Sequence, residues 1–107
     1  MKISINNKTF IVIGTEEDNL RILHPDNGGP VLVHSSKVKI IDKSYPKFWK
    51  QAHRNGKVYS YPEEFLTPNY FRNLWEVKGL LEIDNFYSVL EKFYPELDIS
   101  NRKWITS

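Results

Sequence analysis

The chain has 107 residues, of which 15 are Lys or Arg and 13 are Asp or Glu, and its formal net charge is +2. This length suits a single domain over residues 1–107 that buries roughly two thirds of the surface its unfolded chain would expose. There is no cysteine, which excludes a disulfide framework, a thiolate metal site and a thiol nucleophile. No apolar run reaches the ~18 residues of a membrane-spanning helix, and nothing at the N-terminus looks like a signal peptide, so we expect a cytoplasmic protein.

The first 42 residues have the pattern of a small β domain. Apolar and β-branched residues gather in short runs, and the segments between them are rich in Asn, Asp, Gly and Pro, which favour turns. The predicted strands are 3–5, 10–13, 20–23, 30–33 and 38–41. Five short strands in meander order suit a closed barrel, because closure removes exposed edges.

Residues 29–42, with the sequence GPVLVHSSKVKIID, resemble the last two strands of SH3-like small barrels. In those barrels a glycine begins the fourth strand, a single helical turn follows it, and a Val-x-Ile strand closes the sheet. The resemblance implies a five-stranded antiparallel barrel over residues 1–42. Peptide-binding SH3 domains place an aromatic residue where this chain has His34, Ser35 and Ser36, so polyproline binding is not implied.

After Asp42 the pattern changes to that of helices. Ser44 as N-cap, Pro46 in the first turn and Gly56 after the end predict a helix over about 46–55. A second helix is predicted from Thr67-Pro68 to Gly79. A third begins at Asp84 and stops before Pro95, with an apolar stripe of Phe86, Leu90 and Phe93. The expected fold is α+β, with an SH3-like barrel at 1–42 and about three helices over 43–107 sharing its core.

Catalytic motifs are missing from the sequence. There is no Gly-x-Ser-x-Gly, no phosphate-binding glycine loop and no His-Glu-x-x-His. Adjacent carboxylates at Glu63 and Glu64 are explained by the start of a helical turn. The expected hairpin register pairs His34 with Arg21 or Leu23, which leaves His34 diagonal to His24 and disfavours a metal site. We therefore expect no enzyme, no metal and no cofactor.

Basic residues concentrate between residues 37 and 57, where seven cations accompany a single acid, Asp42. In the predicted helix three of them share one face, with Trp49 close by, and this mixture of cations and aromatic rings suits phosphates and bases. The alternative is that the aromatic residues dock the helix while the cations are solvated. The candidate nucleic-acid-binding residues are Lys43, Lys47, Trp49, Lys50, Arg54 and Lys57.

Tyrosines and acids characterise the second half of the chain. Tyr87 and Tyr94 share one flank of the predicted third helix with Glu91, and Tyr59 and Tyr61 alternate on an extended segment. Exposed tyrosines among carboxylates are typical of surfaces that hold a cationic partner. The alternative is that these tyrosines are structural. The candidate protein-binding residues are Tyr59, Tyr61, Tyr87, Glu91 and Tyr94.

These patterns favour a non-enzymatic partner-binding protein of a bacterium or phage, of the inhibitor or immunity type, that covers the active cleft of a cationic, nuclease-like target. The bacterial setting is inferred only by association, from a short chain that is rich in Ile, Lys, Asn and Tyr. The alternative is a nucleic-acid-binding small barrel that uses the basic segment 37–57. Neither hypothesis includes a membrane partner.

Overall fold

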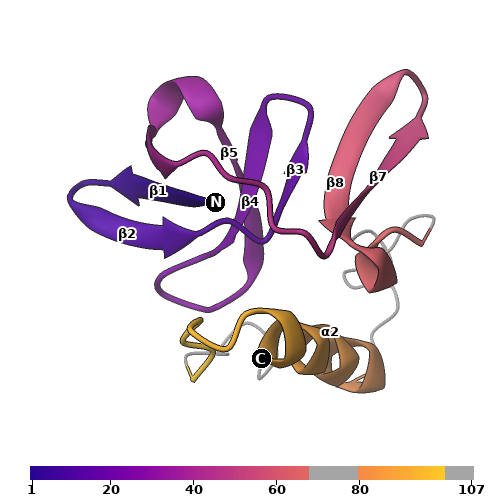
Figure 1. Cartoon of the computed structure of the whole chain (residues 1–107). Helices are drawn as coiled ribbons and strands as arrows, with labels where there is room; N and C mark the ends of the chain where they lie inside the picture. The colour runs from indigo at the N-terminus through magenta and orange to yellow at the C-terminus, as the bar shows by residue number, and fades with distance from the viewer. Residues whose placement is uncertain (68–79, 101–107) are drawn as a thin grey trace.

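The computed structural model describes residues 1–67 and 80–100. In these residues, strands form two antiparallel sheets of order β2-β1-β6 and β5-β4-β3-β8-β7, and the helix α2 lies below them (Figure 1). The elements are β1 (Lys2–Ile5), β2 (Lys8–Ile11), β3 (Gly14–Glu16), β4 (Asn19–Leu23), β5 (Pro30–His34), the 3-10 turn η1 (Ser35–Lys37), β6 (Lys39–Asp42), β7 (Trp49–Arg54), β8 (Lys57–Pro62), the 3-10 turn η2 (Glu63–Phe65) and α2 (Leu80–Phe93).

The first 42 residues do not form the expected closed barrel. The chain crosses from one sheet to the other inside the predicted strand 10–13: Val12 N–H donates to Met1 C=O at 3.0 Å, and Ile13 N–H donates to Arg21 C=O at 2.8 Å. β1, β2 and β6 therefore make one sheet, and β3, β4 and β5 belong to the other. The far edge of β3 pairs with β8, so this sheet continues into the second half of the chain.

The predicted helix over 46–55 is wrong, because this segment forms β7 of a hairpin with β8. Asn55 and Gly56 connect the two strands with φ of 52° and 76°. Positive φ at both central residues is the geometry of a two-residue hairpin turn, for which Asn-Gly is the preferred sequence. Gly56, expected to end a helix, therefore belongs to a turn.

The helical half of the expected fold is also wrong. The described residues contain a single α-helix, α2. It begins at Leu80, four residues before the predicted start, and ends at Phe93, before Pro95. The predicted helix from Thr67-Pro68 to Gly79 falls mainly on residues 68–79, which lie outside the described residues. The described chain is mostly β, with two sheets and one helix in place of a barrel with three helices.

Two hydrophobic clusters make the core. The inter-sheet cluster takes buried residues from strands of both sheets, and the helix cluster joins the five-stranded sheet to α2. The partly buried side chain of Phe48 packs against both clusters. The inter-sheet cluster is Ile3, Val12, Leu20, Ile22 and Trp49. The helix cluster is Ile13, Leu23, Tyr61, Phe65, Phe86, Tyr87, Val89, Leu90 and Tyr94.

We expect Gly14→Ala to destabilise the protein. A Cβ at Gly14 would overlap the Tyr61 ring, so the buried ring must shift, and such overpacking costs about 1–3 kcal/mol. Urea unfolding of Gly14→Ala should show this loss in the free energy of unfolding. In a Tyr61→Leu background, which removes the ring, the same substitution should cost much less. Equal costs in the two backgrounds would show that the ring is not the obstacle.

Candidate functional site

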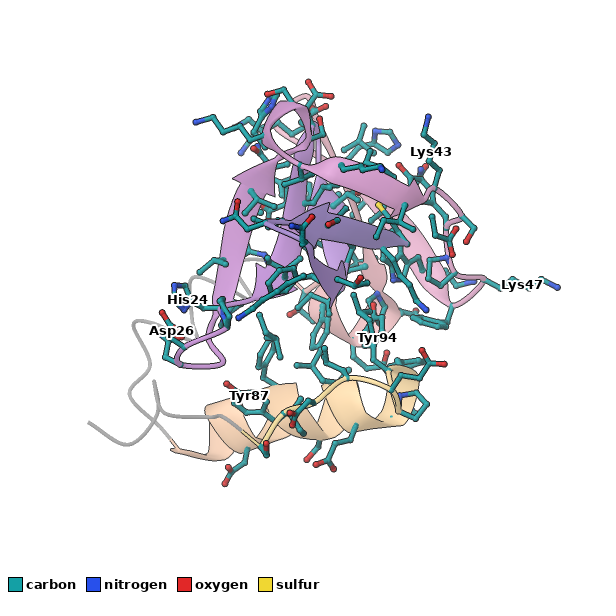
Figure 2. The ribbon with its side chains drawn as sticks, turned by 90° about the vertical axis from the view of Figure 1, so that its left-hand side faces the viewer. His24, Asp26, Lys43, Lys47, Tyr87 and Tyr94 are labelled. Carbon is teal, nitrogen blue, oxygen red and sulfur yellow. The ribbon has the colours of Figure 1, made fainter. Side chains whose placement is uncertain are left out.

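The predicted protein-binding tyrosines lie mainly inside the molecule. Tyr61, Tyr87 and Tyr94 are 1%, 0% and 6% exposed, so the expectation that Tyr87 and Tyr94 are exposed anchors is wrong. Figure 2 shows both pointing from the helix side toward the sheets. Tyr59 is half-buried against the helix cluster, and Glu91 alone of the five candidates is exposed.

The phase of α2 explains this placement. Tyr87 in α2 and Tyr94, the residue directly after α2, lie on the flank next to Phe86 and Leu90, and all four side chains are buried. A core-facing helix normally buries an apolar stripe at least about 100° wide, which includes neighbouring flanks. The buried hydroxyl of Tyr87 has a hydrogen-bond partner, because its Oη donates to Gly28 C=O at 2.6 Å.

Trp49, a predicted nucleic-acid-binding residue, is also buried, at 9% exposed. Its Nε1–H donates to Tyr94 Oη at 2.7 Å, and Tyr94 Oη donates to Ile13 C=O at 2.8 Å. Burial raises the pKa of the Tyr94 hydroxyl above its ordinary value. The indole is therefore a structural group, and its ring is not available to stack on a base.

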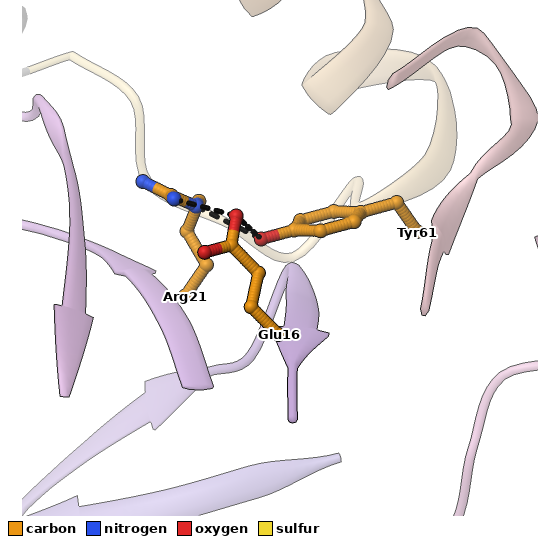
Figure 3. Close-up of polar contacts among 3 residues, drawn as sticks. All are labelled: Glu16, Arg21 and Tyr61. Atoms are coloured by element: carbon orange, nitrogen blue, oxygen red, sulfur yellow. Dashed lines mark hydrogen bonds and ion pairs between the residues drawn. The ribbon is translucent and has the colours of Figure 1, made fainter. Parts of the chain in front are cut away.

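A buried polar network, which the sequence did not reveal, joins Glu16, Arg21 and Tyr61 (Figure 3). Glu16 Oε1 accepts from Arg21 Nη2 at 2.8 Å and from Tyr61 Oη at 3.2 Å, and Arg21 Nε donates to Tyr61 Oη at 2.9 Å. Arg21 is 7% exposed. The one signal in the sequence is a cation inside the apolar strand Leu20-Arg21-Ile22-Leu23.

Glu16 and Tyr61 stabilise the positive charge of the buried Arg21 side chain. Burial alone lowers the pKa of Arg21, but the combined contributions of Tyr61 and Glu16 raise it overall. Burial is also the largest cause of the raised pKa of Tyr61. A buried cation is tolerated only when it is paired and hydrogen-bonded, so this network fixes how β3, β4 and β8 lie together.

The basic residues predicted to bind nucleic acid lie mostly on the surface. Lys43, Lys47, Lys50 and Lys57 are exposed, as are Lys37 and Lys39. None of these six lysines forms an ion pair with another residue of 1–67 or 80–100. Arg54 differs, because it is half-buried and its Nη1 donates to Thr67 C=O at 3.2 Å.

Three of the lysines and one tyrosine define what we call the lysine surface: Lys43, Tyr45, Lys47 and Lys50. Lys50 lies on β7, an edge strand, and the others belong to the loop between β6 and β7. Lys43 and Lys47 extend from the same side of the molecule, opposite His24 and Asp26 (Figure 2).

The loop that carries the lysine surface is fixed at both ends. At its start, Asp42 Oδ1 accepts from Ser44 N–H at 2.9 Å and from Ser44 Oγ at 2.6 Å, and these bonds lower the pKa of Asp42. At its end, Trp49 N–H donates to Pro46 C=O at 3.1 Å. Phe48 packs its ring on Phe93 at a centroid distance of 5.0 Å.

Acidic residues occupy a different part of the surface. Asp84 and Glu91 are exposed on α2, and Glu63, Glu64, Glu96 and Asp98 are exposed near it. Two of these acids form ion pairs with other described residues: Glu64 pairs with Lys92 at 3.2 Å, and Glu96 pairs with Lys2 at 3.8 Å. In the part of the chain that the structure describes, none of these exposed acids forms an ion pair with a residue of the lysine surface.

Two surface hollows border the segment that follows α2. One of ≈ 350 Å³ is lined in part by Phe10, His24, Glu96 and Asp98. A smaller one of ≈ 200 Å³ is mostly apolar and includes Phe93. Among residues 1–67 and 80–100, no cluster of three or more His, Cys, Asp or Glu side chains is placed to hold a metal ion.

Comparison with protein families, with curated proteins and with solved structures finds no match to this chain. In the described part of the chain, no helix has the length and apolar composition needed to cross a membrane.

Alkaline pH should destabilise the protein through Tyr94 and Tyr61. Their folded-state pKa values lie above the ordinary 10.0, so above pH 10 the unfolded state loses these protons first and the free energy of unfolding falls as pH rises. Each tyrosine can contribute a slope of up to about 1.4 kcal/mol per pH unit. In thermal melts, the Tm should stay constant between pH 8 and the ordinary tyrosine pKa of 10.0 and should fall at higher pH.

Tyr94→Phe separates the contribution of this hydroxyl. At neutral pH the substitution should cost about 1–3 kcal/mol, because it leaves the Trp49 N–H and the Ile13 C=O buried without their partner. Its alkaline decline should be shallower than that of the wild-type protein. An unchanged Tm at neutral pH would contradict the hydrogen-bond chain.

Proposed function

We propose that the protein binds nucleic acid through the lysine surface. The observation that supports this most is that six exposed lysines lie within residues 37–57 and lack ion-pair partners among the described residues. Unpaired lysines can meet phosphates without first breaking internal ion pairs. The gain on binding then comes from the counterions that the nucleic acid releases.

The position of the lysines favours this function over simple protection of an edge strand. Charged residues on an edge strand prevent pairing with other sheets, which would account for Lys50 on β7. Lys43 and Lys47 lie outside the strands, on a loop held by hydrogen bonds and by aromatic packing. A loop held in this way keeps the backbone that carries these lysines in one arrangement, which reduces the backbone entropy lost on binding.

Charge reversal on the lysine surface should weaken binding. A fluorescently labelled oligonucleotide should bind the wild-type protein at about 50 mM salt, and contacts to three phosphates of a single strand give a log–log salt slope near −2. The triple change of Lys43, Lys47 and Lys50 to Glu should abolish the binding. If the triple variant keeps the Tm of the wild-type protein, the loss of binding is electrostatic and is not caused by unfolding.

Lys8→Glu is the matched control for Lys47→Glu, because Lys8 is exposed on β2, at the other edge of the three-stranded sheet from β6. The two variants change the net charge equally. Lys47→Glu should reduce affinity and flatten the salt slope by about 0.7, whereas Lys8→Glu should do much less. If neither single- nor double-stranded oligonucleotides bind the wild-type protein, the proposal fails.

A cationic protein partner is the second candidate, and the exposed Asp84 and Glu91 on α2 favour it. In this inhibitor or immunity-type role, the carboxylates would steer association with a basic target while Tyr87 and Tyr94 remain structural.

Immobilised polylysine serves as a probe of the acidic surface. Glu91→Lys should reduce retention, and Lys47→Glu should not reduce it. The second candidate is contradicted if the wild-type protein is not retained at low salt, or if Glu91→Lys leaves retention unchanged.

A further inference from the structure

We infer that the nucleic acid is single-stranded and that one unpaired base stacks on Tyr45; this rests on the proposed function. Tyr45 is 55% exposed and lies in the loop between β6 and β7, midway in sequence between Lys43 and Lys47. It is the most exposed of the large hydrophobic side chains in the described residues, ahead of Ile41 at 52% and Leu32 at 42%.

The exposed ring is held in place by the core. Tyr45 packs on Trp49 with centroids 5.3 Å apart and ring planes at 44°. Trp49 is itself fixed by its hydrogen bond to Tyr94, which is anchored to Ile13 C=O. The tyrosine ring thus contacts a fixed, buried neighbour, while 55% of the Tyr45 surface remains exposed. Such a ring loses little conformational entropy when a flat ligand binds it.

The lysines beside Tyr45 determine what kind of flat ligand fits. Lys43 and Lys47 lie two residues away on either side, and their flexible side chains can reach phosphates flanking a stacked base. In a duplex each base is covered by its neighbours and paired, so its face is not offered to a protein side chain. An exposed aromatic ring between cations therefore selects an unpaired base, in the manner of proteins that bind single strands.

Fluorescence anisotropy tests this inference with labelled oligothymidine and oligouridine of about 16 nucleotides, near the upper end of the length that one small binding domain covers. A duplex of equal length is the comparison, and the two single strands distinguish DNA from RNA as the source of the unpaired base. Wild-type protein should bind at least one single strand more tightly than the duplex. Tyr45→Ala should weaken single-strand binding by roughly 5- to 150-fold, the loss expected for one stacked base, and remove that preference.

Two further variants test stacking itself. Tyr45→Phe keeps the ring and should bind the single strand as the wild-type protein does. Tyr45→Leu keeps apolar surface without an aromatic face and should lose affinity nearly as Tyr45→Ala does. Because position 45 is exposed, all three variants should keep a Tm close to that of the wild type.

The outcomes separate the inference from the proposed function. Equal binding of single strand and duplex, with Tyr45→Ala unchanged, overturns the stacking inference and leaves nucleic-acid binding in place. Retention of full affinity by Tyr45→Leu also overturns stacking. Failure of the wild-type protein to bind any of the three probes at about 50 mM salt overturns the proposed function and the inference together.

Discussion

The hydroxyl of Tyr94 is the point on which the arrangement of this molecule depends. It accepts a hydrogen bond from Trp49 in the inter-sheet cluster and donates one to Ile13 in the helix cluster, so it joins the two halves of the core. The three residues come from distant parts of the sequence. Since each buried polar group needs a partner, this chain of bonds fixes α2, the start of β7 and the crossing between the sheets relative to one another.

The surface features follow from this constraint. Trp49 is the first residue of β7, directly after the loop that carries the lysines, and the ring of Tyr45 packs on this buried indole. The loop can therefore be exposed and still keep one shape. Among the described residues, its lysines form no ion pair with the exposed acids Asp84 and Glu91 of α2. The proposed binding surface thus combines a loop held by buried contacts with lysines that have no ion-pair partner among residues 1–67 and 80–100.

Local signals in the sequence predicted some elements and misassigned others. Five of the six strands in the first 42 residues were recognisable from short apolar runs, whereas β3 was not predicted. The division of the strands between two sheets depends on the crossing after Val12, which no local pattern marks. Ser44, Pro46 and Gly56 matched the start and end of a helix, although Asn55-Gly56 is equally a hairpin turn. The pairing of β8 with β3, which is distant in sequence, favours the hairpin over the helix for this segment. The lysines are exposed, as their charged ends favour, and this could be expected from the sequence. Which flank of α2 is buried could not, because that depends on the sheet residues against which the helix packs.

Chemical-shift mapping on the ¹⁵N-labelled protein tests the central claim most directly. During titration with a single-stranded oligonucleotide, the account predicts that amide resonances of residues 43–50 shift together and in proportion to occupancy. Those of Asp84, Ser88 and Glu91, which are exposed on α2, should stay unchanged. Shifts confined to α2, or no shifts at low salt, would contradict the assignment of the lysine surface as the binding site.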